Sequence, residues 1–119
     1  MPQINGYNYV AVTGTLITQS GAPSSGTLRF AVSDVVWNTS APWVASVDPV
    51  GYTLPSSGML TEINLLAVDN AGLSANWYWT LDMSLNGSTF LTRKVPVLYS
   101  NGDSQDITRL LDLSTVLGG

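Results

Sequence analysis

Few side chains in this 119-residue chain could carry out acid–base or nucleophilic chemistry. The sequence has no histidine and no cysteine, and it contains one lysine, Lys94, and one glutamate, Glu62. A Ser-His-Asp or Cys-His nucleophile is therefore impossible, as is a zinc site built from imidazole and thiolate ligands. A serine activated by lysine would depend on Lys94, which lies beside Arg93 in an expected strand that Pro96 ends. These residues do not favour an enzyme, and we predict no catalytic residue.

The carboxylates have simpler explanations than catalysis. Hydrolysis of a glycoside needs two carboxyl groups that face each other across a sugar, roughly 5–10 Å apart. Glu62 is expected on the solvated face of a strand. Asp34, Asp48 and Asp69 fall at expected strand ends and turns, where a short carboxylate accepts hydrogen bonds from nearby backbone N–H groups. We therefore interpret these three residues as turn-forming.

A group of oxygen-bearing side chains precedes the C-terminal leucines. Asn101, Asp103 and Asp106 resemble part of a calcium loop, because oxygen ligands on a glycine-containing turn suit a hard cation. The alternating ligand spacing fails at Gln105, however, and no bidentate glutamate follows. Helix initiation is the better explanation, with Asp103 as the cap and Asp106 in the first turn of a short helix. We predict no metal site and no cofactor.

The aromatic side chains are the best candidates for binding a ligand. Trp77 and Trp79 share the parity of the apolar residues that follow them in an alternating run, so both are predicted to lie in the core. Trp37 and Trp43 fall in a proline-punctuated stretch that is typical of edge strands or irregular loops. Exposed rings there, together with Tyr78, could stack on the apolar faces of sugars. The possible glycan-contact residues are therefore Trp37, Trp43 and Tyr78.

The elements that must position these side chains are predicted to be short β-strands. Val10 and Val12 share one parity before a turn rich in glycine, proline and serine, and Leu28 and Phe30 share one parity after it. Both runs can therefore face a common core. Gly14 interrupts the first run and predicts a bulge or a close backbone approach. The predicted strands span residues 7–18, 27–36, 59–68, 77–85 and 88–95, with shorter extended runs at 43–47 and 50–54.

This succession of strands predicts an all-β fold. Turn signals separate the strands and no helix alternates with them, which is typical of an antiparallel sandwich with Greek-key connections. The Asn86-Gly87 dipeptide predicts a hairpin between the last two strands. We expect an immunoglobulin-like antiparallel β-sandwich domain across residues 1–103. A short C-terminal arm, helical or extended, is expected across residues 104–119.

The expected arm is rich in apolar side chains. Apolar residues recur at helical spacing from residue 107 and continue toward the C-terminus, where they need a surface to cover. We predict that the arm docks on a neighbouring protein. Its docking residues are predicted to be Ile107, Leu110, Leu111, Leu113, Val116 and Leu117.

Charge and hydropathy exclude several kinds of partner. The net charge is −4 and the four cations form no clustered basic footprint, so no nucleic acid is expected as a partner. No stretch is apolar for long enough to cross a bilayer, so no membrane partner is expected. Charged residues make up 10% of the chain, and a neutral polar surface resists self-association less than a charged one. Such a surface is compatible with packing against other subunits.

The order of several motifs resembles a known family. The runs Val-Thr-Gly-Thr-Leu-Ile-Thr and Gly-Ala-Pro-Ser-Ser-Gly-Thr-Leu-Arg-Phe lie within residues 12–30. Together with the strand at 77–81, the Lys-Val-Pro sequence at 94–96 and the acidic, leucine-rich segment at 106–113, they resemble small β-sandwich modules. These modules occur in tail-associated structural proteins of phages that infect actinobacteria.

The resemblance implies a non-enzymatic structural protein of the virion, located on the tail or baseplate. Such a subunit would bind other virion proteins and form a homo-oligomer through its sandwich surface and its C-terminal arm. Two alternatives stay open. One is a capsid decoration protein of the same fold, and the other is a carbohydrate-binding module that recognises host cell-wall glycans.

Overall fold

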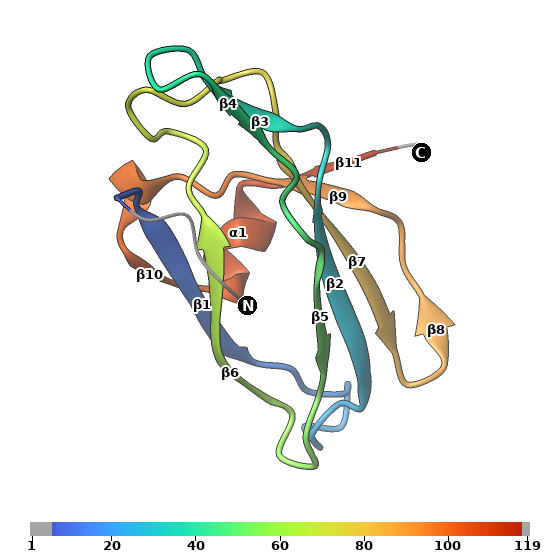
Figure 1. Cartoon of the computed structure of the whole chain (residues 1–119). Helices are drawn as coiled ribbons and strands as arrows, with labels where there is room; N and C mark the ends of the chain where they lie inside the picture. The colour runs from blue at the N-terminus through green and yellow to red at the C-terminus, as the bar shows by residue number, and fades with distance from the viewer. Residues whose placement is uncertain (1–5, 118–119) are drawn as a thin grey trace.

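Two β-sheets face each other across one apolar core (Figure 1). The structure is a computed structural model that describes residues 6–117. The smaller sheet contains, in spatial order, β10 (Ser104–Asp106), β1 (Tyr9–Thr15) and β6 (Met59–Leu66). The larger sheet contains β11 (Thr115–Val116), β9 (Arg93–Val95), β7 (Trp79–Leu85), β2 (Gly26–Val32) and β5 (Val50–Thr53), and β8 (Ser88–Thr89) pairs with β7. The predicted all-β, immunoglobulin-like sandwich is confirmed in its architecture.

The remaining elements cover one end and one side of the sandwich. β3 (Val36–Asn38) and β4 (Trp43–Ala45) form a separate hairpin, which lies at the top of Figure 1. The short 3₁₀ helix η1 (Tyr99–Asn101) precedes β10. α1 (Ile107–Asp112) contacts β1 and β10 of the smaller sheet and β9 of the larger one, so it closes the sandwich on that side.

Alternating side chains build the core, as the period-2 pattern predicts. The buried residues of the three central strands β1, β2 and β7 are Val10, Val12, Leu28, Phe30, Trp79 and Leu81. The indole N–H of Trp79 donates to the carbonyl oxygen of Leu66 at 2.8 Å, which ties the larger sheet to the smaller one. Trp77 is also buried, and its ring packs edge-on against Trp79 with the ring centroids 6.3 Å apart. The prediction that both tryptophans lie in the core is confirmed.

Gly14 forms the predicted bulge. The pairing register between β1 and β6 shifts between Val12 and Gly14, where the backbone of Gly14 has a φ of +151°. A Cβ atom on Gly14 would lie 2.6 Å from Cγ2 of Ile107. Glycine is therefore needed both for the backbone conformation and for the close approach of α1.

The expected strand that returns from the Asn86-Gly87 turn is divided in two. β8 pairs with the end of β7 and β9 pairs with its beginning, while residues 90–92 lie outside both strands, although the Phe90 N–H still donates to the Met83 carbonyl oxygen at 3.0 Å. The hydroxyl group of Thr92 donates to the carboxylate of Asp82, and Leu117 N–H donates to the Thr92 carbonyl oxygen. Residues 90–92 are thus held by the backbone and a side chain of β7 and by the C-terminal segment, so the middle of the predicted strand is replaced by an irregular loop.

The C-terminal segment is built into both sheets. β10 pairs in parallel with β1, and β11 pairs antiparallel with β9. The predicted helix is confirmed at Ile107–Asp112, but its N-cap is Asp106, whose carboxylate accepts from Thr108 N–H at 3.0 Å. The expectation of Asp103 as the cap is wrong. The predicted boundary between 1–103 and 104–119 does not separate two structural units, because β10 and α1 complete the sandwich. The parts of these two predicted ranges that fall on residues 1–5, 118 and 119 lie outside the described residues.

Candidate functional site

The predicted docking residues fall into two groups. Ile107 and Leu110 are fully buried in the core of the chain itself, and Leu111 packs against that core. These side chains are covered by β1, β9 and β10, so Ile107 and Leu110 are not available to a partner, contrary to the prediction. Leu113 and Val116 remain exposed, with 51% and 43% of their surface open to solvent. Leu117 is half-buried.

Two further exposed apolar side chains lie in the loop that the end of the C-terminal segment contacts. Phe90 is 48% exposed and Leu91 is 57% exposed, both in the loop between β8 and β9. The bond from Leu117 N–H to the Thr92 carbonyl oxygen, at 2.7 Å, joins this loop to the C-terminal segment. We use the name apolar edge for Phe90, Leu91, Leu113 and Val116.

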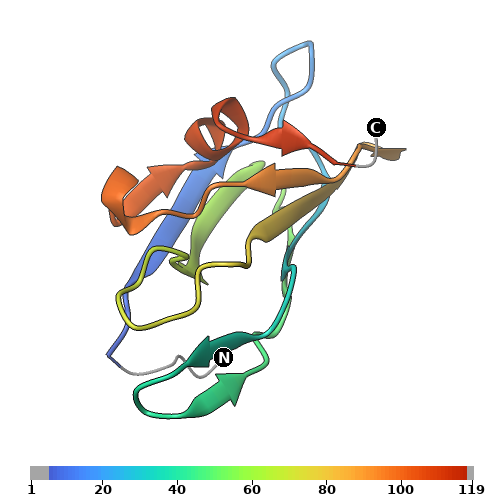
Figure 2. The same cartoon turned by 90° about the horizontal axis from the view of Figure 1, so that it is seen from above.

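The residues of the apolar edge lie along the last two strands of the larger sheet, because Leu113 precedes β11, Val116 lies in it, and Phe90 and Leu91 precede its partner β9. β11 pairs with β9 on one side and has no strand partner on its other side among residues 6–117. Figures 1 and 2 both show it at the margin of the sheet. An edge strand presents backbone N–H and C=O groups that another chain can pair with. Apolar side chains and open backbone groups therefore occur together on one margin of the molecule.

Trp37 and Trp43 do not form a joint stacking platform. In the β3–β4 hairpin Trp37 pairs with Val44 and Asn38 pairs with Trp43. Paired residues share a face and successive residues alternate, so the two tryptophans lie on opposite faces. Trp43 packs edge-on against Tyr7 at a centroid distance of 5.9 Å, and both tryptophans are half-buried.

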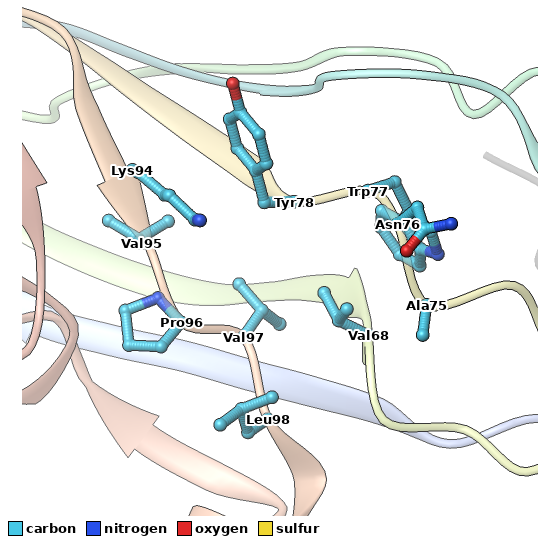
Figure 3. A pocket seen from close by; sticks show the side chains of 10 residues that line it. All are labelled: Val68, Ala75, Asn76, Trp77, Tyr78, Lys94, Val95, Pro96, Val97 and Leu98. Atoms are coloured by element: carbon cyan, nitrogen blue, oxygen red, sulfur yellow. The ribbon is translucent and has the colours of Figure 1, made fainter. Parts of the chain in front are cut away.

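Tyr78 lies apart from both tryptophans, on the rim of a groove of about 480 Å³ (Figure 3). The floor of this groove includes Val95 and Val97, which are buried, and the Tyr78 ring points away from Val97 in Figure 3. The Lys94 ammonium lies 4.6 Å from the centroid of the Tyr78 ring. This cation–π contact occupies a face of the ring on which a sugar would have to stack.

A second, more polar groove of about 620 Å³ lies on the outer face of the smaller sheet. Three tyrosine side chains, those of Tyr7, Tyr9 and Tyr99, contribute to its lining, and the groove is named the tyrosine groove after them. The other lining residues are Asn8, Ala11, Glu62, Asn64, Asp103 and Ser104.

The strand register explains the hollow. Ala11 of β1 pairs with Asn64 of β6 on one side and with Ser104 of β10 on the other, so these residues form one row across the sheet. Their neighbours along each strand face the core, which directs this row outward. Because Ala11 and Ser104 are small, the floor is low between the tyrosines.

Several polar groups of the tyrosine groove are unpaired. Within residues 6–117, the carboxylates of Glu62 and Asp103 and the side-chain amide of Asn64 make no hydrogen bond or ion pair. No lysine or arginine contributes to the lining. The groove therefore offers acceptors, an amide donor and the exposed ring of Tyr99, with a negative charge.

The Asp69 carboxylate positions the wall of the groove that contains Tyr99. Its two oxygens accept from the backbone N–H groups of Tyr99, at 2.7 Å, and Ser100, at 3.0 Å. Partial burial raises the pKa of Asp69, but the two donors outweigh burial and hold that pKa below its ordinary value. The neighbouring Asn70 side chain donates to the Asn8 carbonyl and accepts from Asn8 N–H, which fixes the chain beside Tyr7.

Sequence reasoning missed the tyrosine groove. Glu62 and Asp103 are distant in the sequence and belong to no common motif. The parallel pairing of β10 with β1 brings them to one groove. The alternation of Tyr7 and Tyr9 with buried Val10 was a weak signal for outward tyrosines. Nothing in the spacing connects them to Tyr99, because η1 reaches this face through tertiary contacts.

The turn interpretation holds for one of the three aspartates. Asp34 accepts from Val35 N–H at 2.7 Å, whereas the Asp69 carboxylate accepts from Tyr99 and Ser100, about thirty residues away, and so makes a tertiary contact instead of a local turn. No side-chain hydrogen bond of Asp48 occurs within the described chain. Among residues 6–117 no group of three or more acidic residues is arranged to hold a metal ion, and no helix there has the length and hydropathy to cross a membrane.

Taken together, the fold defines the chain as an all-β sandwich of immunoglobulin-like architecture with a short C-terminal helix. No family model matches the sequence, and comparisons with curated proteins and with solved structures gave no significant match.

Proposed function

We propose that this chain is a non-enzymatic structural subunit that assembles with further copies of itself through its apolar edge. The observation that carries the proposal is the exposure of Phe90, Leu91, Leu113 and Val116 beside the open strand β11. Four large apolar side chains around one sheet margin form the kind of surface that subunit contacts cover.

A second copy of the chain fits this margin. β11 can pair antiparallel with β11 of another copy around a two-fold axis, which satisfies the open backbone groups of both strands. The same contact removes both apolar edges from water. A low content of charged residues, 10% of the chain, leaves little electrostatic repulsion to oppose the contact.

Within this class we place the subunit in a phage virion, on the tail or baseplate, where it also contacts other virion proteins. The support is the ordered set of motifs in residues 12–30, 77–81 and 94–96 that resembles tail-associated sandwich modules. A capsid decoration protein is the nearest alternative, because it needs the same compact sandwich and the same kind of docking surface.

The assembly is tested by light scattering of the wild-type chain and of two variants. The wild type should have a mass that is a defined multiple of 12.6 kDa. The double variant Leu91→Ser, Val116→Ser should be a folded monomer, with folding checked by circular dichroism. The control Val44→Ser alters a residue that is 69% exposed but lies on the β3–β4 hairpin, so it should assemble like the wild type. A monomeric wild type at all concentrations contradicts the proposal.

The virion location needs its own measurement. Mass spectrometry of particles purified from a lysate of the strain that carries this coding sequence should detect peptides of the chain. Their absence from purified particles, together with their presence in the soluble fraction, would rule out a virion subunit while leaving the self-association result intact.

A further inference from the structure

We infer that the tyrosine groove binds a neutral carbohydrate. This site differs from the three residues expected to contact glycans, since Trp37 and Trp43 lie on opposite faces of their hairpin and Lys94 covers the Tyr78 ring. Trp43 packs on Tyr7 at the margin of the groove, so the proposed stacking surface is the ring of Tyr99. The inference is independent of the proposed assembly, because the groove and the apolar edge belong to different sheets.

The aromatic side chains supply the first part of the recognition. A sugar ring presents C–H groups on its faces, and these pack on tyrosine rings while the phenol hydroxyl stays in contact with water or a sugar hydroxyl. Tyr99 is 39% exposed and no side-chain bond of Tyr99 occurs within the described chain, so its ring is free to contact a ligand. The low floor at Ala11 leaves room for a ring beside it.

The unpaired polar groups supply the second part. Sugar hydroxyls donate to carboxylates, and the carboxylates of Glu62 and Asp103 accept no hydrogen bond from residues 6–117. The Asn64 amide can both donate and accept, as pairs of sugar hydroxyls require. Specific binding of a polyhydroxylated ligand needs such groups to be unsatisfied before it arrives.

Charge determines the class of carbohydrate. Two carboxylates without a lysine or arginine in the lining repel uronic acids, sulfated sugars and phosphates. A basic peptide would suit the charge, but it needs pockets for side chains, whereas this groove is shallow, mainly polar and lined by rings. A neutral glycan fits both the charge and the lining.

The test is titration calorimetry with neutral oligosaccharides of glucose, galactose, arabinose and N-acetylglucosamine. At least one should bind saturably, and its affinity should be insensitive to salt between about 0.05 and 0.5 M, because no net ligand charge is involved. An oligogalacturonate should not bind. A lysine-rich peptide is the second control; peptide binding that salt abolishes, without binding of any neutral sugar, overturns the inference.

Two variants locate the site. Tyr99→Ala should weaken binding about tenfold or more, since it removes one stacking surface. Glu62→Gln keeps the side-chain shape and should weaken binding several-fold. The matched control Tyr78→Ala should bind like the wild type, and thermal unfolding should show that all three variants fold. The inference is contradicted if the wild type binds no neutral oligosaccharide. It is also contradicted if Tyr78→Ala loses as much affinity as Tyr99→Ala, or if Tyr99→Ala loses none.

Discussion

At the scale of single residues, the lowered pKa of Asp69 shows that one carboxylate stabilises the folded chain in its charged form. It accepts two backbone N–H groups of η1 and so connects the loop after β6 to the segment before β10. Because the pKa is lowered in the folded state, the stabilisation is fully present above the ordinary value of 3.8 and is lost as the pH falls through the folded value.

Asp69→Asn should therefore lower stability in a pH-dependent way. We expect a loss of about 1 kcal/mol near neutral pH, because a neutral amide with one acceptor oxygen replaces a charged acceptor of two backbone N–H groups. The difference from the wild type should shrink as the pH falls below 3.8 and should be lost below the lower folded pKa, where the wild-type carboxyl is protonated in both states. Urea unfolding at a series of pH values measures both free energies. If the difference in the free energy of unfolding between the two proteins stays constant with pH, the charge of Asp69 does not contribute to stability.

Gly14 is the residue whose replacement should be most informative about the C-terminal segment. In Gly14→Ala the new Cβ would lie 2.6 Å from Cγ2 of Ile107. The alanine backbone would also have to adopt a φ of +151°. We expect a loss of about 2 kcal/mol in the free energy of unfolding. Gly51→Ala is the control, because nothing lies within 4 Å of its Cβ. Equal stability of the two variants in urea would mean that Ile107 does not pack on β1.

At the scale of elements, patterns that repeat within a segment could be predicted and pairings between distant segments could not. The strand at β7 follows from its strict alternation, and α1 follows from the spacing of Ile107 and Leu110. β10 is three residues long and includes one buried side chain, Gln105, so it carries no apolar alternation. Its parallel partner, β1, is fixed by tertiary packing.

The same limit applied to the candidate sites. Leu113 and Val116 are exposed and their docking on a partner stays a prediction, whereas the burial of Ile107 and Leu110 depends on the placement of α1 between the sheets. A helical apolar stripe looks the same in sequence whether it covers its own core or that of a neighbour. The tyrosine groove depends on the β1–β10 register, which no local pattern encodes.

Removal of the C-terminal segment should abolish folding. A chain that ends at Asp103 lacks β10 and α1 and loses the buried side chains of Ile107 and Leu110. Each such loss costs about 2–5 kcal/mol, against a total stability of about 5–15 kcal/mol for a typical domain. Circular dichroism and thermal unfolding should show no cooperative transition. A chain that ends at Leu117 is the control, and cooperative folding of the shorter chain would contradict the described packing.

At the scale of the whole molecule, the two proposed surfaces are compatible. The apolar edge belongs to the margin of the larger sheet and the tyrosine groove to the outer face of the smaller one. Assembly through the apolar edge leaves the tyrosine groove of every subunit open to solvent. Several weak sites on one particle raise the overall affinity by about 10²–10⁴ when a polymer can reach them together. The two proposals together therefore predict an assembly that presents several carbohydrate sites at once.

The parallel pair β1–β10 also sets the order in which the chain can fold during synthesis. Ala11 pairs with Ser104, so most of the chain must be translated before the first strand gains this neighbour. At about 5–20 residues per second, the wait is on the order of ten seconds. During that interval Val10 and Val12 lack the cover of α1, and one margin of β1 is open to other nascent chains. The interval before β10 is translated is therefore the stage of synthesis at which β1 is most open to pairing with another chain.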